Sequence, residues 1–323
     1  MNRRQRAIVY DPITAVEWDY AIERRELAAF GIDFVVPRDV EEARSALPDA
    51  DVVIVSKALP NDDLALLQRC QGVLCYSVGM DGVDANFAAE LGLRVHNVPD
   101  YCTEEVSDHA VALLLALQRN LVRIASATRS GDWEQAYGEL HARPPRRISG
   151  QVAGVVGVGR IGSRVATKCA ALGMTVVGFD PYAAMPAGVR PVDLATLLAE
   201  SDAVLLCAAL TAASGHLIDV SALGLMKKGS VLVNVARGGL VDEEALARAL
   251  RSGQLRGAAL DVRSVEPPDP SADPLAGIDS LILTPHMGAT SIEARHDLHL
   301  RAVDAVLRIL GGGGSGGRSE ETP

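Results

Sequence analysis

The sequence has few aromatic residues, few cysteines and no long uninterrupted hydrophobic run. Aromatic residues make up 4% of the chain, and the five cysteines lack the spacing of a metal site or a disulfide framework. No apolar run reaches the roughly 18 residues of a transmembrane helix, and the basic start at residues 3–6 precedes too short an apolar stretch for a signal peptide. We therefore expect buried thiols in a reducing cytoplasm, without a membrane segment or a metal site.

Basic residues are also in the minority, because 41 acidic residues face 31 basic ones and give a net charge of −10. This balance disfavours nucleic acid as the main partner of the chain. Hydrophobic residues make up 48% of the 323 residues, which is enough for cores in about two domains of roughly 150 residues each.

Short β-branched apolar runs alternate with helical stretches in two successive sets, the second beginning near residue 150. Runs that are continuously apolar are typical of parallel strands buried on both faces. The predicted strands are 7–10, 32–36, 51–55, 72–76 and 93–96 in the first set, and 152–156, 175–179, 203–207, 230–235, 257–261 and 281–284 in the second. Helices are predicted between them, for instance at 40–46, 62–70 and 161–172. The fold class is therefore α/β, with two doubly wound parallel sheets.

Two further helices and a tail complete the organisation. Apolar residues at helical spacing predict one long, mostly buried helix over 104–124, which serves either as a core helix or as a dimer surface. An amphipathic pattern predicts a last helix over 292–310. The glycine-rich segment 311–323 cannot bury apolar surface, and we expect it to be disordered.

The second set of strands opens with a dinucleotide-binding fingerprint. The segment Gly157-Val-Gly159-Arg160-Ile161-Gly162 matches G-x-G-x-x-G between a predicted strand and a predicted helix. Gly157 would allow the tight turn, Gly159 the close approach of the pyrophosphate, and Gly162 the packing of the helix. The phosphates would then lie at the helix N-terminus, where free N–H groups and the helix dipole favour anions.

Asp180 follows the next strand, 18 residues after Gly162. Its carboxylate would accept hydrogen bonds from the adenosine ribose and would repel a 2′-phosphate. The sequence therefore predicts NAD, rather than NADP, as the cofactor. A glycine-rich turn that has lost its ligand is the alternative.

Arg237, Glu266 and His286 stand at or just after the last strands of the second set. Ligands of doubly wound sheets bind outside the carboxyl ends of the strands, so these three side chains could reach one crevice. An arginine that binds a carboxylate and polarises a carbonyl, a histidine that donates a proton, and a carboxylate beside it are the groups that carbonyl reduction needs. Taken singly, each could be an ordinary surface or strand-end residue.

Together with the fingerprint, these residues resemble the D-isomer-specific 2-hydroxyacid dehydrogenase family over about residues 5–310. The segments 77–84, 131–133, 179–182 and 209–211 are similar to family landmarks, and 97–110 is most similar to the branch of the C-terminal-binding-protein corepressors. The resemblance implies an NAD-dependent oxidoreductase with His286 as general acid/base, Glu266 as its partner and Arg237 on the 2-oxo acid.

The resemblance also implies further binding residues and an arrangement of domains. Backbone N–H groups of Val78 and Gly79 would bind the substrate carboxylate, with Lys57 nearby. Cofactor contacts would come from the fingerprint and Asp180, and from Cys207, Thr211, Val235, Ala236, Asp261 and Gly288, with Asp261 orienting the nicotinamide carboxamide. A discontinuous, flavodoxin-like substrate domain, 1–99 with 289–310, would flank a Rossmann domain at 100–288, and the chain would form a homodimer through the cofactor domain.

Some positions depart from the family pattern and bear on the substrate. The strand before the substrate loop lacks the nearby arginine of phosphate-handling and corepressor-like members, and Lys57 is the basic residue left near it. A monocarboxylic oxo acid therefore fits better than a phosphorylated one, and better than a phosphite or phosphonate. The aromatic residue that corepressors carry soon after the histidine is missing, and no regulatory domain follows, so we expect no end-product control. The main alternative function is an NAD(H)-sensing scaffold with little turnover.

Overall fold

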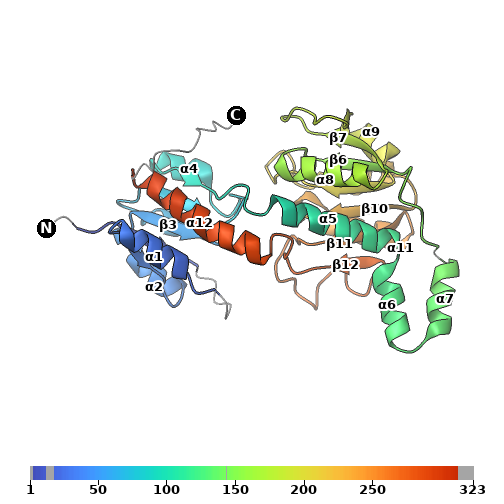
Figure 1. Ribbon diagram of the computed structural model, residues 1–323, viewed down its shortest axis with the longest axis horizontal. Helices are drawn as coiled ribbons and strands as arrows, with labels where there is room; N and C mark the ends of the chain where they lie inside the picture. Colours follow the sequence, from blue (N-terminus) through green and yellow to red (C-terminus); the bar gives the residue numbers. More distant parts are fainter. Residues whose placement is uncertain (1–2, 12–17, 143, 312–323) are drawn as a thin grey trace. The chain divides into compact units, whose positions relative to one another are not determined.

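The computed structural model describes residues 3–11, 18–142 and 144–311, in two compact units. One unit comprises Met1–Tyr101 with Ser291–Pro323, and the other Cys102–Thr290. Figure 1 shows the units in sequence colours, with the helix after residue 290 in red on the unit that contains the blue N-terminal strands. The predicted glycine-rich tail lies, from residue 312 on, outside the described residues.

The first unit contains a five-stranded parallel sheet in the order β2-β1-β3-β4-β5. Its strands are β1 (Arg6–Val9), β2 (Asp33–Val35), β3 (Val52–Val55), β4 (Gly72–Cys75) and β5 (Val95–His96). Its helices are α1 (Ala21–Ala29), α2 (Val40–Ala46), the 3-10 helix η1 (Leu47–Asp49), α3 (Asn61–Leu64), α4 (Ala85–Glu90) and α12 (Ile292–Ile309).

The core of this unit lies on both faces of the sheet. Successive residues of a strand point to opposite faces, so Val52 packs in the cluster that contains Leu27 of α1 and Val306 of α12. Val53 packs in the cluster on the other face, which contains Ala43 of α2. All four residues of β3 are buried, which explains its uninterrupted apolar sequence.

The second unit contains a seven-stranded parallel sheet in the order β12-β11-β10-β9-β6-β7-β8. Its strands are β6 (Val152–Val156), β7 (Thr175–Phe179), β8 (Arg190–Pro191), β9 (Ala203–Leu206), β10 (Ser230–Asn234), β11 (Leu255–Leu260) and β12 (Leu281–Leu283). Its helices are α5 (Thr103–Gln118), α6 (Leu121–Arg129), α7 (Trp133–Ala142), α8 (Arg160–Ala171), α9 (Leu194–Glu200), α10 (Val220–Leu225), the 3-10 helix η2 (Gly238–Leu240) and α11 (Glu243–Arg251). The predicted α/β class with two doubly wound sheets is confirmed.

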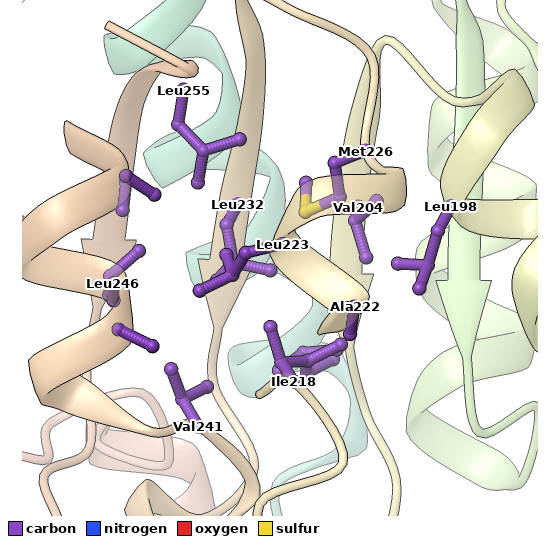
Figure 2. Close-up of a cluster of buried hydrophobic side chains, with 14 of the residues drawn as sticks. Leu198, Val204, Ile218, Ala222, Leu223, Met226, Leu232, Val241, Leu246 and Leu255 are labelled. Atoms are coloured by element: carbon purple, nitrogen blue, oxygen red, sulfur yellow. The ribbon is translucent and has the colours of Figure 1, made fainter. Parts of the chain in front are cut away.

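A large apolar cluster joins helices α9, α10 and α11 to the strands of this sheet. Figure 2 shows Leu198 of α9, Leu223 of α10 and Leu246 of α11 around Val204 and Leu232 of two neighbouring strands. The side chains of these five residues are at most 2% exposed. Burial of this kind contributes about 25 cal/mol per Å² of apolar surface removed from water, and it holds the strand ends in fixed relative positions.

Several helices begin at an acidic or hydroxyl side chain that accepts a backbone N–H. Such N-caps satisfy N–H groups that have no partner within the helix. The capping residues are Asp39, Asp84, Asp193, Asp219, Asp242 and Ser291. Helix α8 belongs to the helices without such a cap, and its N-cap residue is Gly159.

The long helix predicted over 104–124 is wrong in its extent. Helix α5 ends at Gln118, Asn120 adopts a φ of 52°, and α6 continues at an angle of 65°. Asparagine enters the left-handed region at low cost and so ends helices readily. The helix predicted over 62–70 is also wrong in extent, because α3 ends at Leu64.

In the described part of the chain no single helix is long and apolar enough to cross a membrane, although α5 and α6 together pass that test.

Candidate active site

The glycine fingerprint forms the turn between β6 and α8. Gly157 has a φ of 84°, and a Cβ there would come within 2.6 Å of the backbone of Ala208. A Cβ on Gly162 would lie 1.9 Å from the carbonyl oxygen of Gly157, whereas a Cβ on Gly159 would meet nothing within 4 Å. Two glycines therefore close the turn, and the third leaves the N-terminus of α8 open. A pyrophosphate fits this uncapped end, because its anionic oxygens suit the free N–H groups and the helix dipole.

Two further residues of this fingerprint, Arg160 and Ile161, are the first residues of α8, where Arg160 is exposed and Ile161 half-buried. Asp180 lies directly after β7 and accepts three backbone hydrogen bonds. Its Oδ2 accepts from Val158 at 2.9 Å, and its Oδ1 accepts from Tyr182 and Ala183, each at 2.9 Å. Burial disfavours the charged form of Asp180, but these N–H donors outweigh it and hold its pKa below the ordinary value. The side chain is therefore an anion bonded to the fingerprint loop.

Four further predicted cofactor residues follow β9, which pairs with β6, and β10, which pairs with β9. Cys207 follows β9 and is half-buried, and burial raises the pKa of its thiol to about 12. Thr211 is exposed, and its backbone N–H donates to Ser214 Oγ at 2.8 Å. Val235 is 8% exposed after β10, and Ala236 is half-buried. All strands are parallel, so these residues lie along the same edge of the sheet as the fingerprint.

Arg237 lies in a turn that Asn234, a residue missed in the sequence, stabilises. The side chain of Asn234 is fully buried, accepts from the N–H of Ala236 at 3.0 Å, and donates to the carbonyl of Arg237 at 2.9 Å. Arg237 Nη1 donates to the carbonyl of Ala236 at 2.8 Å. The sequence did contain a signal for Asn234, because an amide side chain at the end of an apolar strand, four residues before a pair of glycines, is an unusual choice for a buried position.

Glu266 and His286 are brought together although 20 residues separate them. His286 Nδ1 lies 2.7 Å from Glu266 Oε2, with the two side chains 47% and 37% exposed. The other carboxylate oxygen of Glu266 accepts the backbone N–H of Arg263 at 2.8 Å. The bond to Glu266 leaves His286 Nε2 as the ring nitrogen directed away from the carboxylate, where it can exchange a proton with a ligand.

The backbone of His286 has a φ of 54°, in the left-handed region that residues other than glycine rarely adopt. Asp261 stabilises this turn, because its carbonyl accepts the N–H of His286 at 2.8 Å. Its carboxylate accepts the N–H groups of Met287 at 3.0 Å and Gly288 at 2.8 Å. Strain at such a position persists where the surroundings hold it, and it is frequent at functional sites.

Asp261 is itself buried and bonded to two residues that the sequence pattern did not mark. Thr284 Oγ1 donates to Asp261 Oδ1 at 2.6 Å, and His109 Nε2 lies 3.2 Å from the same oxygen. Burial disfavours its charge, but the bonds from Thr284, Met287 and Gly288 outweigh it and hold the pKa of Asp261 below the ordinary value. The signal that could have marked His109 was a polar, ionisable residue in the otherwise apolar part of helix α5. The predicted contact between Asp261 and the nicotinamide carboxamide stays a prediction.

Apart from Arg237, the residues predicted to bind substrate belong to the first unit. Lys57 is exposed after β3, and the N–H groups of Ser56 and Lys57 donate to the carboxylate of Asp11, each at 2.5 Å. Val78 is 37% exposed and Gly79 half-buried after β4. In the described residues there is no group of three or more His, Cys, Asp or Glu side chains that could hold a metal.

Comparison with known proteins identifies the family. The family model "D-isomer specific 2-hydroxyacid dehydrogenase, NAD binding domain" matches residues 111–288. The hydroxypyruvate reductase of Thermotoga maritima is 32% identical over 314 residues, which cover 95% of this chain and 99% of that protein. The D-3-phosphoglycerate dehydrogenase of Methanocaldococcus jannaschii is 34% identical over 279 residues, which cover 84% of this chain and 52% of that protein. The chain thus spans about half the length of the curated phosphoglycerate dehydrogenases that it matches.

A solved structure agrees with these sequence relatives. The D-lactate dehydrogenase from Aquifex aeolicus complexed with NAD and lactic acid has a TM-score of 0.84 and 27% identity, covering 95% of this chain and 96% of that one. The similarity includes the Rossmann domain that the family resemblance implies. The chain therefore belongs to the D-isomer-specific 2-hydroxyacid dehydrogenase family, and residues 111–288 are its NAD-binding domain.

Proposed function

We propose that this chain interconverts a 2-oxo acid and a D-2-hydroxy acid with NAD(H) as the redox partner. The observation that carries the proposal is the hydrogen bond of 2.7 Å between His286 Nδ1 and Glu266 Oε2, at the same sheet edge as an intact glycine fingerprint. A histidine oriented by a carboxylate is the arrangement that general acid/base catalysis needs.

Three residues of this chain share the work of reduction. The Arg237 guanidinium binds the oxo acid and draws electron density toward the carbonyl oxygen. Bound NADH supplies the hydride that adds to C2 of the substrate. His286 Nε2 gives a proton to the carbonyl oxygen, which becomes the hydroxyl, and Glu266 stabilises the imidazolium before that transfer. In the oxidation direction His286 Nε2 takes the proton back.

The loops of the first unit indicate the substrate class. Residues 56–60 and 76–84, which follow β3 and β4, contain a single basic side chain, Lys57. A substrate phosphate usually binds more than one cation, so we expect an oxo monocarboxylate whose carboxylate meets the N–H groups of Val78 and Gly79. Asn97 supports this loop, because its Nδ2 donates to the carbonyl of Val78 at 2.6 Å.

A homodimer formed through the cofactor domain, and a cytoplasmic location, belong to the same proposal. Helices α6 and α7 expose Leu121, Val122, Trp133 and Tyr137, with between 51% and 61% of each accessible. Apolar side chains gathered in this way favour a protein interface. All five cysteines are free thiols, as expected in a reducing compartment. Sedimentation velocity at micromolar concentration tests the dimer, and a monomer would contradict it.

The test of the activity is the absorbance change of NADH and NADPH across 2-oxo acids, from glyoxylate and pyruvate to bulky and phosphorylated ones. Turnover with NADH and a monocarboxylate is expected. His286→Asn should lower kcat by about 100-fold or more, as loss of a general acid does, with NADH binding retained. NADH binding without turnover of any oxo acid would contradict the proposal and favour an NAD(H)-sensing scaffold.

A further inference from the structure

A buried ion-pair cluster supports the loop that carries Glu266. The guanidinium of Arg263 lies between the carboxylates of Glu243 and Asp273, and the three side chains are only 7%, 10% and 10% exposed. Its Nε and Nη2 donate to Glu243 at 3.1 and 2.9 Å, and its Nη1 and Nη2 donate to Asp273 at 3.2 and 2.7 Å. Both contacts are bidentate, so the plane of the guanidinium is fixed in orientation as well as in position.

The charges in this cluster support each other. Burial disfavours the charge of Arg263, but its bonds to Glu243 and Asp273 outweigh burial and raise its pKa above the ordinary value. The same guanidinium holds the pKa of Asp273 below its ordinary value. Arg263 and Asp273 therefore stay charged at neutral pH, and the cluster joins the loop after β11 to the start of α11 and to the segment before β12.

The backbone around Arg263 contacts the predicted catalytic residues on two sides. Its N–H donates to Glu266 Oε1 at 2.8 Å, and the next N–H, of Ser264, donates to Glu243 Oε1 at 2.9 Å. A Cβ on Gly238, the neighbour of Arg237, would lie 1.9 Å from the carbonyl carbon of Arg263. The peptide after Arg263 thus packs against the turn of Arg237, while the N–H of Arg263 orients Glu266.

We propose that Arg263 is a positioning residue: held between Glu243 and Asp273, it fixes the loop backbone that orients Glu266 toward His286. It acts through that backbone and not on the substrate. The inference rests on the proposed function, since the group being positioned is the acid–base pair of the dehydrogenase. A purely structural role is the competing explanation, and the two differ in the properties that the loss of Arg263 changes.

Arg263→Lys tests the proposal with the charge retained. An ammonium lacks the planar fork that satisfies two carboxylates at once, so the loop loses its fixed orientation. We expect kcat to fall by roughly 10- to 100-fold, the cost of misplacing a catalytic group by about 1 Å. The KM for the oxo acid and the Kd for NADH should stay within about twofold, because binding groups are untouched. The solvent isotope effect on kcat should rise, because proton transfer from His286 becomes slow.

Two further variants separate positioning from stability. Arg190→Lys makes the same substitution in the half-exposed pair of Arg190 with Glu200, at β8 and α9, and should leave kcat unchanged. The triple variant Arg263→Gln, Glu243→Gln, Asp273→Asn avoids leaving a buried carboxylate unpaired, which strongly destabilises proteins. It should fold, bind NADH and show the same loss of kcat as Arg263→Lys.

A kcat for Arg263→Lys within twofold of the unchanged protein would overturn the proposal. So would equal losses in NADH affinity and turnover, or a solvent isotope effect that does not move, because these indicate a partly unfolded enzyme. A crystal structure of Arg263→Lys gives a readout without activity, in which the 2.7 Å contact between Glu266 and His286 should open beyond the limit of about 3.5 Å for a hydrogen bond. If the unchanged protein reduces no oxo acid, the proposed function fails, and this distance still decides the role of Arg263.

Discussion

The two parallel sheets have the same core topology but differ in the residues that come after their first strand. In each sheet the first strand pairs with the second on one side. On its other side it pairs with the third strand, β3, in one unit, and with the fourth strand, β9, in the other. After β1 the chain presents Asp11, whose carboxylate accepts the N–H groups of Ser56, Lys57 and Ala58. After β6 the chain presents the glycine fingerprint and the uncapped N-terminus of α8.

This difference decides which sheet can bind a dinucleotide. At the edge of the first sheet a carboxylate already satisfies the backbone donors, and its charge would repel a phosphate. At the edge of the second sheet Gly159 leaves space at the N-terminus of α8. Asp180, the residue predicted to accept hydrogen bonds from the ribose hydroxyls, is bonded to Val158 in the same turn. A doubly wound sheet thus offers a site at the carboxyl ends of its strands, and the residues of the turn determine which ligand binds there.

The largest effect is expected from a substitution that distorts the glycine turn at the edge of the second sheet, where the dinucleotide is predicted to bind. A Cβ in Gly162→Ala would lie 1.9 Å from the carbonyl oxygen of Gly157, so strand and helix must separate. We expect NADH affinity to fall by about 100-fold or more, or roughly 2.7 kcal/mol, as measured by quenching of protein fluorescence. Gly224→Ala, where a Cβ meets nothing within 4 Å, is the matched control. Equal NADH affinity in Gly162→Ala and the unchanged protein would refute this part of the comparison.

A smaller effect is expected from a substitution that removes the charge of Asp180 but keeps nearly the same side-chain size. In Asp180→Asn one oxygen can still accept the N–H of Val158, while the amide nitrogen cannot accept from Tyr182 and Ala183, and the anion that would repel a 2′-phosphate is gone. The ratio of kcat/KM for NADH to that for NADPH should fall by on the order of 10- to 100-fold, since placing like charges together costs several kcal/mol. Asp193→Asn, at the N-cap of α9, should leave the ratio unchanged. A constant ratio in Asp180→Asn would show that another residue selects the cofactor.

The smallest effect concerns the pH dependence of stability, because the pKa values of two carboxyl groups, one at each sheet edge, are shifted in opposite directions. Burial raises the pKa of Asp11 despite its backbone bonds, so its contribution to stability is present at low pH and lost as pH rises through its folded-state pKa. The pKa of Asp261 is lowered, so its contribution is present at neutral pH and lost as pH falls through its folded-state pKa.

Thermal unfolding of Asp11→Asn and Asp261→Asn at pH 7 and pH 4 measures this contrast. The destabilisation caused by Asp11→Asn should be larger at pH 4 than at pH 7, and that caused by Asp261→Asn smaller, with changes on the order of 1 kcal/mol. If the destabilisation caused by the two substitutions changes in the same direction between pH 7 and pH 4, the two pKa values are not shifted in opposite directions. The double variant should show the sum of both changes, because the residues belong to separate units.

Much of the fold could be predicted because strand and helix periods are local properties. The apolar runs at β3, β6 and β7 predicted strands close to those observed, since a strand buried on both faces must be apolar throughout. The two-residue strand β8 was missed because Arg190 and Pro191 carry no apolar signal. The break after α5 was missed because an apolar pattern continues past Asn120, and only its backbone conformation ends the helix.

The site was predicted more completely in its residues than in its contacts. The spacing of the glycines and the positions of Arg237, Glu266 and His286 after strands marked the sheet edge in advance. The bonds of Asn234, His109 and Thr284 were not marked, because each joins a residue to a partner whose position depends on the folded loops. The roles of these residues in catalysis stay predictions until the variants are measured.

The amino-acid sequence alone was enough to predict the alternation of strands and helices and the glycine turn, because these depend on backbone geometry and on periods of two or 3.6 residues, which neighbouring residues specify. It also contains an arginine, a glutamate and a histidine in that order after strands of the second sheet. The position of Arg263 between Glu243 and Asp273, and the hydrogen bond from its backbone N–H to Glu266, could be seen only in the folded chain. Contacts of that kind join separate loops, and they form only when the packing of the sheet and its helices has fixed where those loops meet.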